Sequence, residues 1–331
     1  MLQSSQSRIS GVGVYLPEQK VSSAELMMEA KCNRFSINEH FLERATGIKE
    51  RRFSRTESLA DMAIYASQEA IRDASIGFNE IDLVLYCGID NDYAEPSMAH
   101  EVACALGINT AFCMDVSNAC IGLLTGVSVA NAYIVSGAAQ NVLICTGEKP
   151  SVIAMDACRQ MSKAQNKKKF IEPLGALTVG DAGGAFVVSK SNSKSFIKAM
   201  KYSSFPEHRS LCYYKRHGTH YEGVMEMEKI TFACSQAHES LINETYNMLS
   251  WTPIDVDRAY CHQVGKKHHK SMVKLMGIEP EKATETYPYF ANLTSATHAV
   301  NMYFNPPNKG EKILFMGSGS GLSICQIGVQ Y

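Results

Sequence analysis

The chain contains a long internal repeat, and this repeat strongly limits what the sequence can fold into. One copy begins LADMAIYASQEA at residue 59 and ends at Ile108, and a later copy begins TFACSQAHESLI at residue 231 and ends at Ile278. Each copy reads as a helix, a short apolar strand, a polar loop and a second helix, with an offset of about 170 residues between the copies. Strands that alternate with helices, twice over, predict an α/β protein of two pseudo-symmetric halves.

Each half also ends in a glycine-rich turn that leads into a strand, at residues 180–189 and 317–329. We place the boundary in the polar stretch that runs from Lys190 to Lys198. Residues 1–190 then form the N-terminal half and residues 191–331 the C-terminal half. We expect the active site between the halves, where the corresponding loops converge.

Composition excludes several classes of protein. Lys plus Arg (32) nearly balances Asp plus Glu (33), which argues against a general nucleic-acid binder. The 11 cysteines are odd in number and spread along apolar stretches, as expected for free thiols in a reducing compartment. The start of the chain has no signal-peptide pattern, so we expect a cytoplasmic protein. The apolar stretch 121–139 contains polar residues and lacks basic flanks, which favours a buried helix over a membrane span.

Three residues at corresponding loops could carry chemistry. Cys120 lies in DVSNACIGLLTGV, where a polar segment passes into an apolar helix, and a helix N-terminus lowers the pKa of a thiol. Its counterpart one repeat later is Asn292, again just before a helix, and His262 ends the strand of the second half. A cysteine in this position alone is more often a packing residue. Cysteine, histidine and asparagine together supply a nucleophile, its partner and donors for an oxyanion.

The whole chain resembles the ketoacyl synthase III branch of the thiolase superfamily. The resemblance rests on ISGVGVYLPEQKVSSAEL at the start, then ERATGIKERRF, DVSNACIG, GDAGGAFVV, CHQV, ANLTSAT and the final GSGSGLS, in this order. It implies a five-layered α-β-α-β-α thiolase fold and a homodimer. It also implies an acyltransferase that uses acyl-coenzyme A or acyl carrier protein as substrates and has no tightly bound cofactor or metal.

The resemblance assigns roles to matching positions. Cys120 resembles the acylated nucleophile, and His262 and Asn292 resemble the pair that binds the thioester carbonyl of the second substrate. The backbone N–H groups of Cys120 and Ser320 resemble the oxyanion hole of the acyl-enzyme. Lys266, Lys267 and Lys270, together with His268 and His269, form a basic patch that would meet carrier protein or coenzyme A. A solvated helix face explains these lysines equally well.

Glu95 helps to indicate which condensation reaction the protein catalyses. It precedes Pro96 in NDYAEPSMAHEVACALG, where priming synthases carry an apolar residue, and in the family this loop lines the acyl pocket of the partner subunit. An unactivated acyl thioester must lose an α-proton to a base, and Glu95 could be that base. The pattern is similar to head-to-head condensing enzymes of olefin biosynthesis and to pyrone-forming ketosynthases. A surface glutamate without a role is the simpler alternative.

We therefore expect a Claisen condensation between the acyl group on Cys120 and a second acyl or 3-oxoacyl thioester. Decarboxylative condensation with malonyl carrier protein is the nearest alternative. Acyl transfer to oxygen or nitrogen and a non-catalytic partner subunit fit less well, because Cys120, His262 and Asn292 are all present. A glycine usual in the family is missing near Met225 to Met227, which we expect to reshape the acyl pocket.

Overall fold

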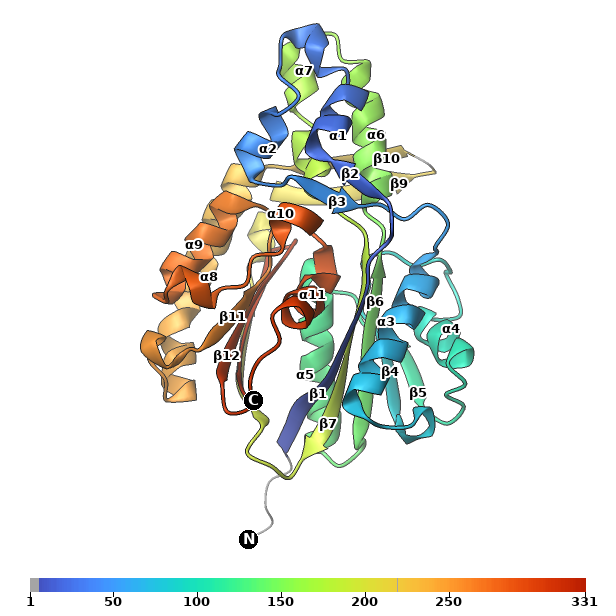
Figure 1. Ribbon diagram of the computed structural model, residues 1–331, viewed down its shortest axis with the longest axis vertical. Coiled ribbons are helices and arrows are strands. Elements are labelled where there is room, and N and C mark those ends of the chain that lie inside the picture. The colour runs from blue at the N-terminus through green and yellow to red at the C-terminus, as the bar shows by residue number, and fades with distance from the viewer. Residues whose placement is uncertain (1–5, 219) are drawn as a thin grey trace.

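Two sheets organise the molecule (Figure 1). The computed structural model describes residues 6–218 and 220–331. The first sheet has the order β1-β7-β6-β4-β5, in which β4 runs parallel to β5 and β6 while β7 is antiparallel to both of its neighbours. Its strands are β1 (Gln6–Tyr15), β4 (Leu83–Tyr86), β5 (Phe112–Asp115), β6 (Asn141–Glu148) and β7 (Ala182–Ser191).

The second sheet repeats most of the first. Its order is β11-β12-β13-β8, where β11 runs parallel to β12 and the other pairs are antiparallel. Its strands are β8 (Phe196–Ser204), β11 (Arg258–Cys261), β12 (Lys312–Gly319) and β13 (Ser323–Gln330). In chain order within each half, β8, β11, β12 and β13 take the places of β1, β4, β6 and β7. This topology confirms the two pseudo-symmetric halves, whereas their division at residue 190 stays a prediction.

Helices form the other three layers. Helices α5 (Gly122–Val135) and α11 (Thr297–Phe304) lie between the sheets, as Figure 1 shows. The outer face of the first sheet is covered by α3 (Leu59–Ala74) and α4 (Met98–Ala105). On the far side, α8 (Met227–Leu249) packs on the second sheet and α9 (Lys266–Met276) packs on α8. The result is the predicted α-β-α-β-α arrangement.

The apolar stretch after Cys120 forms the central helix α5. Leu123, Leu124 and Val127 are fully buried in a core that receives side chains from both sheets. A helix that packs on all sides needs apolar residues all round, which explains why this stretch resembles a membrane span in sequence. No helix in the described part of the chain is both long and apolar enough to cross a membrane.

The remaining elements lie at one end of the sheets, at the top of Figure 1, and have their own core around Leu26, Met27 and Phe170. They comprise the β2–β3 pair (Lys20–Ser22, Glu50–Arg52), the β9–β10 pair (Cys212–His217, His220–Met225), and the helices α1 (Ser23–Glu29), α2 (Phe41–Thr46), α6 (Ser151–Ser162) and α7 (Lys167–Ile171). Helix α10 (Tyr287–Phe290) precedes the loop that carries Asn292. Short 3-10 turns are at Cys32–Phe35, Phe78–Glu80, Ala119–Ile121, Leu174–Thr178, Pro206–Leu211, Pro253–Asp255, Pro280–Lys282 and Thr294–Ala296.

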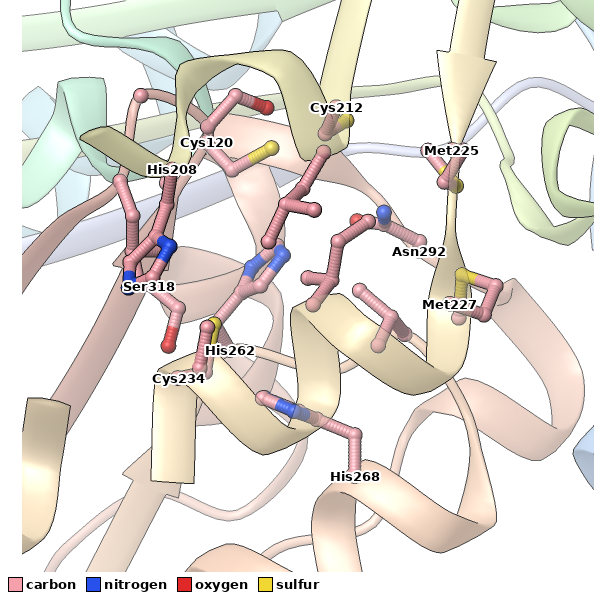
Figure 2. Close-up of a pocket in the computed structure, with 18 residues that line it drawn as sticks. Cys120, His208, Cys212, Met225, Met227, Cys234, His262, His268, Asn292 and Ser318 are labelled. Atoms are coloured by element: carbon pink, nitrogen blue, oxygen red, sulfur yellow. The ribbon is translucent and has the colours of Figure 1, made fainter. Parts of the chain in front are cut away.

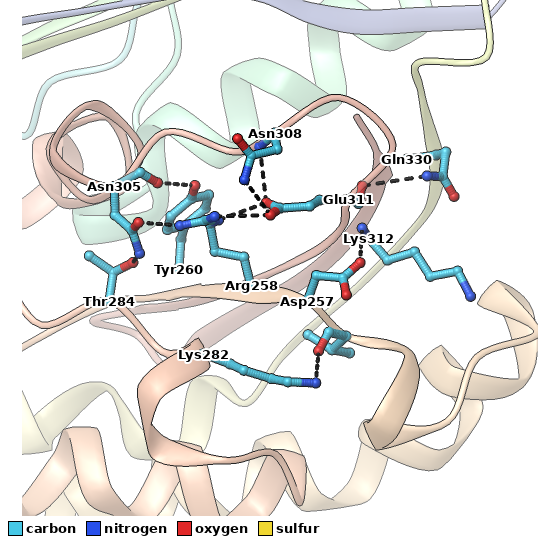
Figure 3. Close-up of polar contacts among 11 residues, drawn as sticks. Asp257, Arg258, Tyr260, Lys282, Thr284, Asn305, Asn308, Glu311, Lys312 and Gln330 are labelled. Atoms are coloured by element: carbon cyan, nitrogen blue, oxygen red, sulfur yellow. Dashed lines mark hydrogen bonds and ion pairs between the residues drawn. The ribbon is translucent and has the colours of Figure 1, made fainter.

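A network of polar contacts holds Arg258, the first residue of β11, in place (Figure 3). The Arg258 guanidinium donates from Nε and Nη2 to the two oxygens of Glu311, at 2.9 and 3.0 Å. The Tyr260 hydroxyl donates to the backbone carbonyl of Asn305 at 2.6 Å. These contacts hold the strand whose other end carries His262.

Candidate active site

Cys120 lies in a tight 3-10 turn that leads directly into α5. The preceding Ala119 has a φ of 46°, in the left-handed region that costs a non-glycine residue energy and is typical of functional turns. Gly122 closes the turn, because a Cβ there would lie 2.2 Å from the carbonyl oxygen of Cys87. The backbone thus presents a half-buried Cys120 toward the cavities described below.

The thiol of Cys120 is neutral at rest. Burial raises its pKa above the ordinary value, and the neighbouring Cys212 and Glu148 raise it further. The prediction of a lowered thiol pKa was therefore wrong, because the effect of burial outweighs that of the helix N-terminus. Formation of a thiolate requires a group that accepts the proton.

His262 follows β11 directly. Its backbone N–H donates to the carbonyl of Met316 at 2.8 Å, which extends the pairing of β11 with β12 by one residue. Burial lowers the pKa of His262 well below its usual value, and His268 and His298 lower it further. The imidazole is consequently neutral, with one ring nitrogen able to donate and the other able to accept.

Gln263 keeps the His262 loop in place, a role that the sequence did not reveal. Its Oε1 accepts from the backbone N–H groups of Thr286 and Tyr287 at 3.0 and 2.9 Å, and its Nε2 donates to the Thr284 carbonyl at 2.5 Å. The side chain is fully buried. The only signal in the sequence was its position next to His262.

Asn292 is fixed by backbone and side-chain bonds. It forms a parallel bridge with Val179, and its N–H donates to the Thr178 carbonyl at 2.9 Å. Its side-chain Oδ1 accepts from the Thr294 N–H at 2.9 Å. Because Oδ1 is occupied, Nδ2 is the group that can donate to a substrate oxygen.

One cavity of about 560 Å³ brings the three residues together, although they come from distant parts of the chain. Figure 2 shows Cys120, His262 and Asn292 around it. Most of the remaining wall is apolar and includes Leu211, Met225, Met227, Ile230, Ala233 and Leu322. Such a wall suits an acyl chain, and a thioester would lie against the three polar residues.

Two further cavities adjoin this one. A cavity of about 1070 Å³ shares Cys120, Asn292 and Ser320 with the first, and is also lined by Glu148 and Thr294. A cavity of about 950 Å³ shares Met227, Val264 and His268 with the first, and is also lined by residues of α2 and by Lys266 and Lys267. Cys120 therefore lines two adjoining cavities, and the third cavity meets the first at Met227, Val264 and His268.

The basic patch differs from the expectation. Lys266 and Lys267 line the 950 Å³ cavity, and Lys267 pairs with Glu228 at 3.2 Å, but Lys270 is not among the described residues that line that cavity. His268 and His269 are buried, and burial lowers the pKa of each to about 4. The expectation that these two histidines contribute to a surface patch was wrong, because α9 turns them toward the protein interior.

The other two predicted site residues have different positions. Ser320 lines both cavities at Cys120, where an oxyanion donor is needed. Glu95 lies in the segment between β4 and α4, is exposed, and is not among the described residues that line either cavity at Cys120. The structure of one chain thus places Ser320 at the site and leaves Glu95 outside it.

Glu148 is a site residue that the sequence analysis missed. It ends β6, is 2% exposed, and lines the same cavity as Cys120 and Asn292. Burial raises its pKa to about 8. A charged residue at the end of the otherwise uncharged strand NVLICTGE was the available signal.

Comparisons with known proteins agree with this geometry. The family model of 3-oxoacyl-[acyl-carrier-protein (ACP)] synthase III matches residues 114–204, and the model of its C-terminal part matches residues 246–331. An acyl-CoA:acyl-CoA alkyltransferase of Shewanella oneidensis is 28% identical, with 98% of each chain covered. A beta-ketoacyl-[acyl-carrier-protein] synthase III of Rickettsia bellii is 27% identical, with 96% of each chain covered.

The fold has close counterparts among solved structures. A crystal structure of a Xanthomonas campestris OleA variant superimposes with a TM-score of 0.91 at 24% identity, over 98% of each chain. The five layers and the two halves of the present chain are thus those of the thiolase fold. The chain belongs to the 3-oxoacyl-[acyl-carrier-protein] synthase III family of acyl-condensing transferases.

Proposed function

We propose that this protein joins two acyl thioesters head to head by a Claisen condensation that needs no malonyl donor. In the first half of the reaction, Cys120 Sγ attacks the carbonyl carbon of an acyl thioester. The carrier thiol leaves, and the acyl group remains on Cys120 as a thioester. The backbone N–H groups of Cys120 and Ser320 would stabilise the oxyanion that forms during this transfer.

In the second half, another acyl thioester binds with its carbonyl oxygen toward His262 and Asn292. The neutral imidazole and the free Nδ2 of Asn292 both donate to that oxygen as it gains charge. Loss of the α-proton gives an enolate, whose carbon attacks the acyl group on Cys120. The C–S bond to Cys120 breaks, the α-proton passes from the base to the departing sulfur and restores the thiol, and a 3-oxoacyl thioester leaves.

Glu95 of the partner subunit is the proposed acceptor of the α-proton. Its exposure in a single chain is what a residue contributed to a neighbouring site requires. The proposal implies a homodimer in which the segment between β4 and α4 of one protomer reaches the cavity of the other. The exposed Lys266 and Lys267, which line the 950 Å³ cavity, would meet the phosphates of coenzyme A or the acidic face of a carrier protein.

One observation carries the proposal: Cys120 opens onto two cavities whose walls it shares with Asn292. A priming synthase needs room for one acyl chain and a short malonyl group, whereas a head-to-head enzyme needs room for two chains. The Shewanella oneidensis relative, named an acyl-CoA:acyl-CoA alkyltransferase, supports the same function. The Rickettsia bellii relative, named a beta-ketoacyl-[acyl-carrier-protein] synthase III, supports decarboxylative condensation as the second candidate.

Mass spectrometry of products separates the two functions. Pure protein is incubated with a medium-chain acyl-coenzyme A and no malonyl donor. A product that contains both acyl chains, or the ketone formed when that product loses carbon dioxide, supports head-to-head condensation. Accumulation of acylated Cys120, with product formed only after a malonyl thioester is added, would identify a decarboxylative synthase instead.

The role of Glu95 is tested by replacing it with an uncharged residue of the same size. Glu95→Gln should leave acylation of Cys120 intact and lower condensation by at least about 100-fold, the usual contribution of a general base. Glu101→Gln, a neighbouring carboxylate on α4, serves as the matched control and should condense at the wild-type rate. Normal condensation by Glu95→Gln would exclude it as the base.

A further inference from the structure

Glu148 is a buried carboxyl group in the cavity of the nucleophile. Its Oε1 accepts from the Thr146 hydroxyl at 2.6 Å and from the backbone N–H of Ile89 at 3.3 Å. Both bonds end on the same oxygen, so a proton can reside on Oε2 without breaking either. Glu148 and Cys120 line the same cavity, and the charge of the carboxylate raises the pKa of that thiol.

No lysine or arginine in the described part of the chain forms an ion pair with Glu148. Lys149, the next residue, donates instead to the backbone carbonyl of Glu57 at 2.8 Å. A carboxylate buried without a cation holds its proton to unusually high pH, and burial raises the pKa of Glu148 to about 8. The hydrogen bond from Thr146 lowers this pKa because it stabilises the ionised form.

Other titratable groups face Glu148 from the elements around it. Burial raises the pKa of Tyr86 and Cys87 well above their usual values and also raises that of Cys212, so these groups stay neutral near pH 8. Asp90 pairs with Arg216 at 3.4 Å. The further titratable or charged residues that line the cavity are Cys120, Lys149, Tyr213, Tyr214 and Tyr221.

Acyl transfer to Cys120 creates a need for a proton acceptor. The thiol is neutral at rest, yet its proton must leave as the bond from Sγ to the acyl carbon forms. His262 is a poor acceptor, because burial and neighbouring histidines hold its pKa well below the usual value. A carboxylate whose conjugate acid titrates near the working pH is a far better base.

We propose that Glu148 accepts the Cys120 proton during acyl transfer and returns it to the departing carrier thiol, either directly or through one water molecule. The Sγ–acyl bond forms as the carrier's C–S bond breaks. The proton moves from Sγ to the Glu148 carboxylate, then to the sulfur of the carrier, and Glu148 ends ionised as it began. Glu148 thus serves the first half of the proposed condensation and Glu95 of the partner subunit the second.

This assignment rests on Cys120 being the acylated residue in the proposed function, but not on how the second substrate is activated. The test therefore measures acylation alone, in a single turnover with acyl-coenzyme A and no second donor. Intact-protein mass spectrometry follows the acyl group, and the free carrier thiol is measured in parallel, from pH 6 to pH 9. Absence of any acylation in the wild-type protein would refute the proposed function itself.

Glu148→Gln is a well-matched variant, since the amide oxygen can still accept from Thr146 and Ile89 while the titratable group is lost. Wild-type acylation should rise with pH and level off near pH 8, where Glu148 becomes ionised. The variant should acylate about 100-fold more slowly at pH 8 and lack this inflection. If Glu148 only holds the Ile89 loop in place through its hydrogen bond, the variant will acylate at the wild-type rate with the same pH profile. That result would refute the proposal.

Thr146→Val provides a second test that keeps the carboxyl group. It removes the hydroxyl that stabilises the ionised form, so the inflection should move to higher pH while the limiting rate stays within about threefold of wild type. If Glu148→Gln does not fold, Thr146→Val still tests whether Glu148 accepts the Cys120 proton. An inflection that remains at the wild-type pH in Thr146→Val would overturn the assignment to Glu148.

Discussion

Cys120, His262 and Asn292 are all uncharged at rest. The Cys120 thiol is neutral because burial raises its pKa, and the His262 imidazole is neutral because burial lowers its pKa. Asn292 contributes an amide whose oxygen is already bonded within its own loop. Dipoles fixed in a largely apolar cavity stabilise a developing oxyanion more strongly than they would in water, and they need no rearrangement as the charge forms.

We predict that Asn292→Ala separates the two half-reactions. Loss of one oxyanion donor should lower the rate of condensation by about 10²–10³-fold. Acylation of Cys120 should change much less, because the backbone donors of the first half remain. Single-turnover acylation and steady-state product formation, measured on the same preparation, would check this. A variant that loses both activities equally would assign Asn292 to the first transfer as well.

At the scale of elements, the loop that carries Asn292 is bonded directly to the turn and helix that carry Cys120. The fully buried Ser295 accepts at Oγ from the N–H of Leu123 at 2.8 Å and donates to the carbonyl of Cys87 at 3.0 Å. One hydroxyl thus connects the start of α5, the end of β4 and the asparagine loop. The spacing between Cys120 and Asn292 depends on this junction.

Ser295→Ala should therefore lower both stability and condensation. The substitution leaves a buried N–H and a buried carbonyl without their partner, which costs about 1–3 kcal/mol. Urea unfolding would measure the loss. Ser136→Ala, which removes an exposed hydroxyl near the end of α5, is the control and should change stability by less than about 0.5 kcal/mol. Wild-type stability in Ser295→Ala would mean that water or a shifted loop replaces the hydroxyl.

We predict that the stabilising effect of the Arg258–Glu311 ion pair at the start of β11 depends on pH. The hydrogen bonds from Arg258 hold the pKa of Glu311 at about 2, below its ordinary value of 4.5. A lowered folded-state pKa contributes stability above the unfolded value and loses it as the pH falls toward 2. Glu311→Gln should therefore cost about 1 kcal/mol at pH 7, after solvent screening of this partly exposed pair, and much less at pH 2.

Urea midpoints of the wild-type protein and of Glu311→Gln at pH 7, 4 and 2 would test this. The difference between them should shrink steadily as the pH falls. A difference that is independent of pH would show that Glu311 stabilises β11 through packing rather than through its charge.

At the scale of the whole molecule, the proposed reaction depends on two chains. Glu95 lies outside the described cavities at Cys120 of its own chain, so its assignment as a base requires a partner protomer. In a two-fold symmetric dimer the same segment serves both sites, and each site contains Cys120 from one chain and Glu95 from the other.

Mixed dimers would test this arrangement. Cys120→Ala and Glu95→Gln should each be inactive in condensation alone. After the two are unfolded together and refolded, half of the dimers are mixed, and each mixed dimer has one site with both residues intact. About a quarter of wild-type activity should return. If Glu95 acts within its own chain, no mixed site is complete and the mixture will stay inactive.

Much of the fold could be predicted from the sequence because it depends on patterns along the chain. The repeat predicted two sheets related by pseudo-symmetry, and the strand orders confirm it. Cys120, His262 and Asn292 lie at corresponding loops of the two halves, which predicted that they would meet, and they line one cavity. Periodicity and turn residues are local properties, so a single sequence displays them.

The class of the fold, the family and the three residues of the candidate site could be predicted from the sequence, because each follows from the order of residues along the chain. The charge states of the titratable groups at the site depend on packing and came from the structure alone. It buried His268 and His269, which local composition suggested were exposed, and it placed Glu148 in the cavity of Cys120. Protonation depends on the surrounding dielectric and on charges brought near by packing, and both arise from segments far apart in the chain.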